Sequence, residues 1–81
     1  MKREEVIRLL VKNLKLAIPE FSDEDFDMSK SYRDMGVSSL ELVEVVAVTA
    51  KEMAVKLTPT ALSSVKTTND LVDVLLKAKG A

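Results

Sequence analysis

The sequence predicts an all-α protein: a small four-helix bundle with three long helices and one short helix, and a long loop between the first two. Apolar residues recur at helical spacing in three separate segments. Only two glycines and two prolines interrupt the 81 residues, which favours long helices. A chain of this length buries one modest core, so we expect a single domain over residues 1–81.

The first helix is expected over residues 2–17. Its apolar residues repeat with the period of a helix face, and they are Ile7, Leu10, Val11, Leu14 and Ile18. Glu4 and Glu5 near its beginning and Lys15 near its end match the charges that a helix dipole favours. Pro19 disfavours helical geometry at the residue before it, so the helix should end there.

Residues 19–38 form the longest irregular stretch. Its apolar residues follow no sustained period, and they are Phe21, Phe26, Met28, Tyr32, Met35 and Val37. A connection this long is uncommon in a compact domain unless it packs or functions. We therefore expect these side chains to pin the loop across the bundle, with one helical turn at about 23–27.

The second helix is expected over residues 39–55. It is apolar over much of its circumference, and the charged residues that interrupt this apolar surface are Glu41, Glu44, Lys51 and Glu52. Such a helix either lies at the centre of the bundle or turns some apolar residues towards a partner.

Two further helical segments complete the bundle. Pro59 should end the segment that contains the second helix, and a short third helix is expected at about 60–64. The stretch Thr67-Thr68-Asn69-Asp70 is typical of a helix start. The last helix should run from there to about Lys79, with Gly80 suitably placed after it.

The composition excludes several classes of site. Cys and His are both absent, which removes disulfides, thiolate nucleophiles, Cys/His metal sites and the usual general base near neutral pH. We therefore expect no catalytic residue and no metal site. The longest apolar stretches fall well short of a membrane span and no signal peptide is visible, so we expect a cytoplasmic protein without membrane insertion.

The net charge of −1 hides a gradient along the chain. Residues 1–19 carry five basic and two acidic groups, residues 20–44 carry two basic and eight acidic groups, and residues 45–81 carry five basic and three acidic groups. An acidic middle zone can attract basic protein surfaces, and it argues against nucleic acid as a partner of that face. Ordinary solvated loop charge is the alternative explanation.

Two adjacent serines stand at the start of the second helix. Ser38 and Glu41 fit a capping box, in which each side chain accepts a hydrogen bond from the backbone of the other. Ser39 falls at the first helical position, where capping does not use its hydroxyl. A catalytic nucleophile would require a base, and the chain has no His, so an enzyme is not expected. A helix N-terminus does suit a phosphate group, but plain helix-start composition also explains a second serine.

The stretch Tyr32–Val45 resembles the phosphopantetheine attachment site of acyl carrier proteins, whose pattern is approximately D-[LM]-G-x-D-S-L-x-x-V-E-[LI]. The matching residues are Asp34, Met35, Gly36, Ser39, Leu40, Val43 and Glu44. The resemblance extends over the chain length, the first helix, the long loop and the closing T-x-x-D-L-x-x-x-L segment, here Thr67–Leu75. Motif, length and helix order together make it specific.

This resemblance implies a non-enzymatic carrier. Ser39 would accept 4′-phosphopantetheine from coenzyme A, transferred by a phosphopantetheinyl transferase that needs Mg²⁺. The terminal thiol would then present acyl intermediates as thioesters to ketosynthases, acyltransferases and other acyl-processing enzymes of fatty-acid or polyketide-type biosynthesis. A monomer is expected. The residues expected to dock these partners are Ser38, Leu40, Glu41, Val43, Glu44 and Ala47.

Two departures from the family pattern favour a specialised carrier. Ser38 stands where most of the family has aspartate, and residues 48–52 hold a single glutamate, Glu52, in a part of the helix that is usually rich in glutamate in carriers of fatty-acid synthesis. Together with a mild pI near 5.4, they favour a polyketide-type or other secondary pathway. A peptidyl or aminoacyl carrier and an unmodified helical interaction module remain the alternatives.

Overall fold

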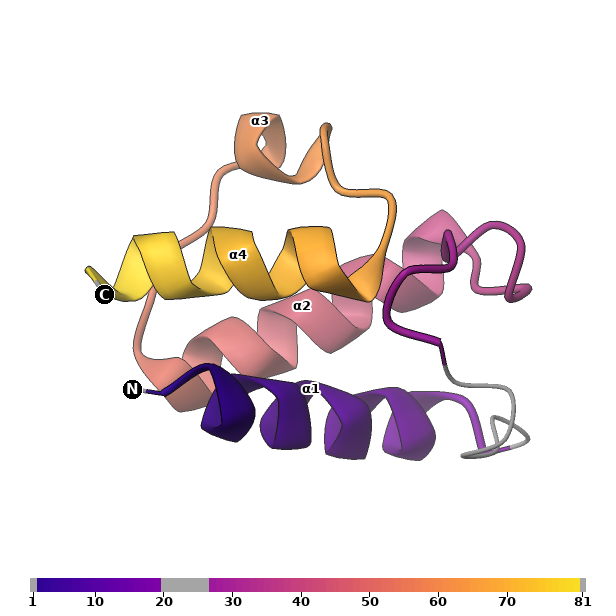
Figure 1. Ribbon diagram of the computed structural model, residues 1–81, viewed down its shortest axis with the longest axis horizontal. Coiled ribbons are helices and arrows are strands. Elements are labelled where there is room, and N and C mark those ends of the chain that lie inside the picture. Colours follow the sequence, from indigo (N-terminus) through magenta and orange to yellow (C-terminus); the bar gives the residue numbers. More distant parts are fainter. Residues whose placement is uncertain (1, 20–26, 81) are drawn as a thin grey trace.

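The computed structural model describes residues 2–19 and 27–80, and within them the fold is all-helical. The helices are α1 (Arg3–Ala17), α2 (Ser39–Met53), α3 (Pro59–Leu62) and α4 (Thr68–Lys79). Helix α1 packs against both α2 and α4, and the short α3 lies over α4 on the side away from α1 (Figure 1). The predicted bundle of three long helices and one short helix is confirmed.

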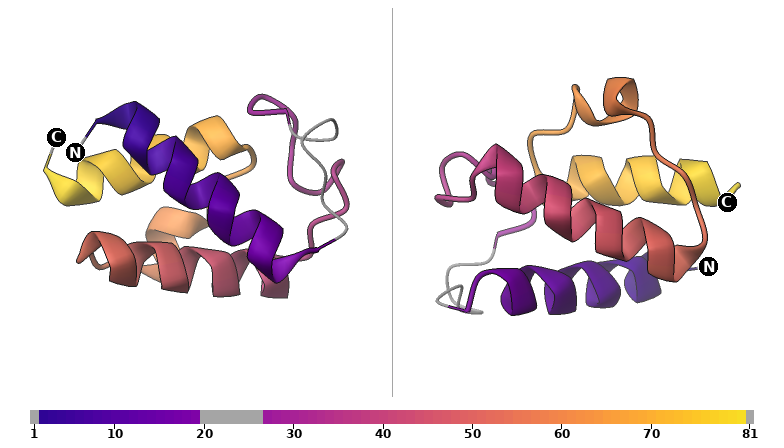
Figure 2. Two further views of the ribbon diagram at one scale, coloured as in Figure 1. Left: turned by 90° about the horizontal axis from the view of Figure 1, so that it is seen from below. Right: turned by 180° about the vertical axis from the view of Figure 1, so that it is seen from behind.

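The two chain ends of the bundle meet at one end of the molecule. The start of α1 and the end of α4 lie side by side in every view (Figures 1 and 2). The start of α2 lies at the opposite end, beside the loop that precedes it (Figure 1). An ion pair of 2.6 Å between Arg3 Nη1 and Asp73 Oδ1 joins α1 to α4.

Helix α2 ends two residues earlier than the sequence predicts. Ala54 adopts the left-handed conformation, with φ 58° and ψ 41°, and its amide donates to the carbonyls of Ala50 and Lys51. These hydrogen bonds close the last turn of the helix. The sequence carries no glycine or asparagine here to mark that stop.

Pro59 begins a helix instead of ending one. Helix α3 therefore starts one residue earlier and ends two residues earlier than the expected range of about 60–64. Pro59 is the first residue of α3, where its missing N–H costs no hydrogen bond. Thr58 caps the helix, because its Oγ1 accepts a hydrogen bond of 3.2 Å from the Ala61 amide. The helix then closes at Leu62.

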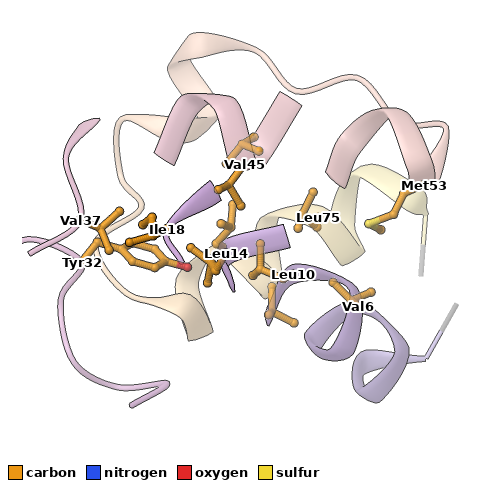
Figure 3. Packing of buried hydrophobic residues seen from close by; sticks show 12 residues of the cluster. Val6, Leu10, Leu14, Ile18, Tyr32, Val37, Val45, Met53 and Leu75 are labelled. Atoms are coloured by element: carbon orange, nitrogen blue, oxygen red, sulfur yellow. The ribbon is translucent and has the colours of Figure 1, made fainter. Parts of the chain in front are cut away.

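The core is aliphatic and is shared by the three long helices (Figure 3). Its fully buried apolar side chains are Val6, Leu10 and Leu14 from α1, Val45 and Met53 from α2, and Leu71, Val72 and Leu75 from α4. In Figure 3, Tyr32, Val37 and Ile18 lie at one end of this core and Met53 at the other. Burial of this kind is the main source of stability in so small a domain.

The loop before α2 is pinned into the core, as the sequence predicts for its described apolar residues. Tyr32 is only 3% exposed, Val37 is buried, and Met28 and Met35 pack against the same cluster. The Tyr32 amide donates to the Lys66 carbonyl at 2.8 Å. Of the helical turn expected at 23–27, only Asp27 is described, and it is not helical. Phe21 and Phe26 lie outside the described residues.

Candidate functional site

Ser38 caps α2, as the sequence predicts. Its Oγ accepts a hydrogen bond of 3.1 Å from the Glu41 amide, and Glu41 Oε1 accepts one of 3.0 Å from the Ser38 amide. The hydrogen bond from the Ser38 amide contributes most to holding the pKa of Glu41 below its usual value, and the interaction with the Ser38 hydroxyl contributes less. The Glu41 carboxylate is therefore ionised at neutral pH, at the helix end where negative charge is favourable.

Ser39 is the first residue of α2 and is exposed. Unlike Ser38, it makes no side-chain hydrogen bond with any described residue. The first amides of a helix have no partner within the helix. The amide of Glu41 is satisfied by Ser38, while those of Ser39 and Leu40 remain at the helix end. A free hydroxyl thus lies beside N–H groups that suit a phosphate.

The backbone before Ser39 is fixed by local hydrogen bonds. The Val37 amide donates to the Tyr32 carbonyl at 2.9 Å, and the Gly36 amide donates to the Arg33 carbonyl at 3.2 Å. Gly36 has a φ of 79°, a conformation that glycine adopts at low cost. Ser31 also bridges to Thr67 in antiparallel fashion. The loop therefore presents the start of α2 from a defined position.

Two shallow cavities border Ser39. One, of about 390 Å³, lies between the preceding loop and the connection from α3 to α4, and Arg33 and Lys66 line it. The other, of about 270 Å³, lies between α2 and α3 and is mostly apolar. Ser39, Leu42 and Val65 line both cavities. A group attached at Ser39 would have room on either side.

Four of the expected docking residues share one exposed face of α2. Leu40, Val43, Glu44 and Ala47 follow the spacing of a single helix side, and we call them the docking face. Leu40 is 71% exposed and Val43 is 53% exposed, which is unusual for large apolar side chains. Glu44 makes no ion pair with a residue that the structure describes.

The other two expected docking residues have a second role. The side chains of Ser38 and Glu41 both take part in the capping box at the start of α2. Ser38 is exposed and Glu41 is half-buried, so both remain at the surface beside the docking face. Any partner that contacts them also contacts the group that fixes the helix start.

Several surface residues near the site were missed by the sequence interpretation. Arg33 lies within the attachment motif, but its neighbours in the sequence do not indicate a function for it. Lys66 is distant in sequence and is brought to the site by the hydrogen bond between its carbonyl and the Tyr32 amide. Leu16 of α1 is 72% exposed and Val48 is 51% exposed, and both line a cavity of about 250 Å³ between α1 and α2. Leu16 could have been noticed because it falls outside the apolar repeat of its helix.

The described residues contain neither a membrane-spanning helix nor a metal-binding cluster. No helix in residues 2–19 or 27–80 is long and apolar enough to cross a membrane. The same part of the chain holds no group of three or more acidic, His or Cys residues placed to bind a metal ion.

Comparison with known proteins identifies the family. Residues 4–75 match the family described as "Phosphopantetheine attachment site". A similar protein is the polyketide biosynthesis acyl-carrier-protein AcpK of Bacillus subtilis (strain 168), which is 23% identical over 75 residues, covering 93% of this chain and 92% of that protein. These findings do not favour a peptidyl carrier or an unmodified interaction module. The chain belongs to the phosphopantetheine attachment family and is an acyl carrier protein, a non-enzymatic protein that works through a covalently attached 4′-phosphopantetheine group.

Proposed function

We propose that Ser39 carries the 4′-phosphopantetheine arm. The observation that supports this most strongly is the division between the two serines. The Ser38 hydroxyl is engaged with the Glu41 amide at 3.1 Å, whereas Ser39 is exposed and makes no side-chain hydrogen bond with a described residue. The residues around Ser39 fit a phosphodiester, because the first amides of α2 lie beside it and two basic residues line the same cavity.

The attachment step is assigned to a phosphopantetheinyl transferase, because the chain has no His and no described residue accepts a hydrogen bond from the Ser39 hydroxyl. Ser39 Oγ loses its proton to a base of the transferase and forms a bond to the phosphorus of coenzyme A that carries pantetheine. The phosphoanhydride bond breaks, and adenosine 3′,5′-bisphosphate leaves. When attached, the arm supplies a thiol that holds acyl groups as thioesters.

The docking face supports a second part of the proposal, that α2 binds acyl-processing enzymes such as ketosynthases and acyltransferases. Its exposed Leu40, Val43 and Ala47 provide an apolar surface that gains free energy when a partner covers it. The carboxylate of Glu44 lies among them and suits a partner Arg or Lys. The partner is therefore a protein surface that is apolar with basic neighbours.

We further propose a polyketide-type pathway, a cytoplasmic location and a monomeric carrier. The pathway is supported by the similar protein, which is named a carrier of polyketide biosynthesis. Ser38 in place of the family's aspartate and the few acidic residues late in α2 favour the same specialised group.

The attachment proposal is tested by mass spectrometry. The purified protein is incubated with coenzyme A, Mg²⁺ and a transferase of broad specificity, and the product is fragmented. We expect the intact mass to increase by one arm and the fragments to locate it on Ser39. An arm on another residue would contradict the proposal, as would an unmodified protein after treatment with several different transferases.

The docking proposal is tested by charge reversal. Glu44→Lys should raise the KM of an acyl-processing partner, such as a ketosynthase, for the modified carrier and leave kcat nearly unchanged, because the substitution alters docking rather than chemistry. Glu4→Lys is the matched control, since Glu4 is also an exposed carboxylate and lies on α1. Equal effects of the two substitutions would contradict a specific role for the docking face.

A further inference from the structure

Two cations share a surface cavity with Ser39. Arg33 comes from the loop before α2, and Lys66 comes from the connection between α3 and α4. Among the described residues that line this cavity, they are the only charged ones, and none is a carboxylate. This concentration of positive charge is unexpected, because residues 20–44 carry eight acidic groups against two basic ones.

Neither cation is neutralised by an ion pair with a described residue. Asp34 follows Arg33 in the chain but does not line the cavity. Asp70 is the carboxylate close to Lys66, and its Oδ2 accepts hydrogen bonds of 3.1 Å from the backbone amides of Lys66 and Thr67. Asp70 thus takes part in the cap of α4, and although its charge also attracts Lys66, both cationic side chains remain exposed.

The residue before the modified serine also matters to this cavity. Ser38 lines it and is neutral, whereas the pattern that the chain resembles has aspartate at this position. A carboxylate there would repel a neighbouring phosphodiester and attract the two cations itself. With Ser38, the anion that the cavity can receive is the one attached to Ser39.

We propose that Arg33 and Lys66 are positioning residues that hold the phosphodiester at the base of the arm. This inference rests on the proposed attachment at Ser39. A phosphorus bonded directly to Ser39 Oγ would stay beside the cavity that Arg33, Lys66 and Ser39 line together. Covalent attachment supplies the high effective concentration that a weak surface ion pair needs in order to be occupied. Arg33 can bind two phosphate oxygens at once, and Lys66 acts as a point charge.

When Arg33 and Lys66 hold the phosphodiester, rotation about the first bonds of the arm is restricted. The contact involves exposed charges, so salt weakens it: the Debye length is about 30 Å at 0.01 M and about 3 Å at 1 M ionic strength. The base of the arm should therefore be more mobile at high salt.

The test measures the ³¹P transverse relaxation rate of the phosphodiester in fully modified protein. Arg33→Gln/Lys66→Gln is compared with wild type and with Arg8→Gln/Lys56→Gln, which removes the same charges from exposed cations away from this cavity. Modification is brought to completion and verified by intact mass, and folding is verified by thermal melting. We expect a lower relaxation rate in the first double variant alone. Wild type and the control should show the same decrease when ionic strength rises to about 1 M.

The outcomes distinguish the role of Arg33 and Lys66 from the attachment at Ser39. Equal relaxation rates in all three proteins, or no response to salt, would overturn the role of Arg33 and Lys66 while leaving Ser39 as the attachment point. Slower modification of the first variant with an unchanged ³¹P rate would also overturn it, because the cations would then serve the transferase alone. A failure of the attachment proposal would be visible earlier, as a protein that gains no mass and shows no phosphodiester signal.

Discussion

At the scale of single residues, the two serines at the start of α2 differ in what their hydroxyls do. Ser38→Ala removes the acceptor of the Glu41 amide and should lower the free energy of unfolding by about 1 kcal/mol. Ser39→Ala removes an exposed hydroxyl with no described partner and should change it by less than about 0.5 kcal/mol. Urea denaturation measures both, and the reverse order would show that the capping role belongs to Ser39.

A buried hydrogen bond ties the loop before α2 to α4. Thr68 Oγ1 donates to the Tyr32 hydroxyl at 2.8 Å, and both residues are buried. Tyr32→Phe leaves the Thr68 hydroxyl without its acceptor and should cost about 1–3 kcal/mol of stability. Tyr32→Phe/Thr68→Val removes both polar groups and should cost less than the sum of the two single substitutions. Additive costs, measured by urea denaturation, would mean that the hydrogen bond contributes nothing.

At the scale of helices, the residue that caps the end of α2 is strained. Ala54 has a φ of 58°, which costs an L-residue roughly 1–2 kcal/mol, whereas glycine adopts it freely. Ala54→Gly should therefore raise the free energy of unfolding, by about 0.5–1 kcal/mol after the greater entropy of the unfolded chain is counted.

The same substitution within α2 provides the control. Ala47→Gly places glycine in an exposed helix interior and should lower the free energy of unfolding by about 1 kcal/mol. Opposite signs for the two changes in urea denaturation would support the strain at Ala54. A loss of stability in both would contradict it.

The helices show where local sequence information suffices. The capping box of Ser38 and Glu41 and the stop at Pro19 depend on neighbouring residues, so the sequence predicts them well. The end of α2 at Met53 could not be predicted, because its C-cap Ala54 is left-handed, a conformation that alanine rarely adopts. Pro59 was ambiguous because proline is compatible with both the end and the first residue of a helix.

At the scale of the whole molecule, stability should change little between about pH 5 and pH 9, since the chain has no His. Among the described residues, four carboxyl groups have pKa values held below the ordinary 3.8 of Asp or 4.5 of Glu, each mainly by hydrogen bonds: Asp27 by Ser29, Glu41 by Ser38, Glu52 by Asn13 and Asp70 by Lys66 and Thr67. The stability they contribute is fully present above the unfolded-state values. It is lost as pH falls through the lowered folded-state values.

The alkaline limit has one main cause. Burial raises the pKa of Tyr32 from 10.0 to about 12, so folding opposes ionisation of this hydroxyl. Stability should therefore fall as pH rises from about 10 to 12, and Tyr32→Phe should remove most of that decline. Melting temperature measured against pH tests both limits, with Glu52→Gln expected to make the acid side less steep. A maximum of stability below about pH 4 would contradict the lowered carboxyl pKa values.

The site as a whole was only partly predictable. Ser39 and the docking face lie on one helix, so their relation follows from helical spacing alone. Arg33 and Lys66 meet Ser39 because the Tyr32 amide binds the Lys66 carbonyl, and that long-range contact leaves no pattern in the sequence. The apolar cavity that Leu16 lines likewise exists only once α1 and α2 are packed together.

The central claim is that Ser39, and not its neighbour, receives the arm. The most direct measurement is the intact mass of Ser39→Ala and Ser38→Ala after incubation with coenzyme A, Mg²⁺ and the transferase, with both variants shown to be folded. The account predicts that Ser38→Ala gains the mass of one arm and that Ser39→Ala gains none. The account would be contradicted if Ser39→Ala gained the mass of an arm. It would also be contradicted if folded Ser38→Ala gained none while Ser39→Ala was modified.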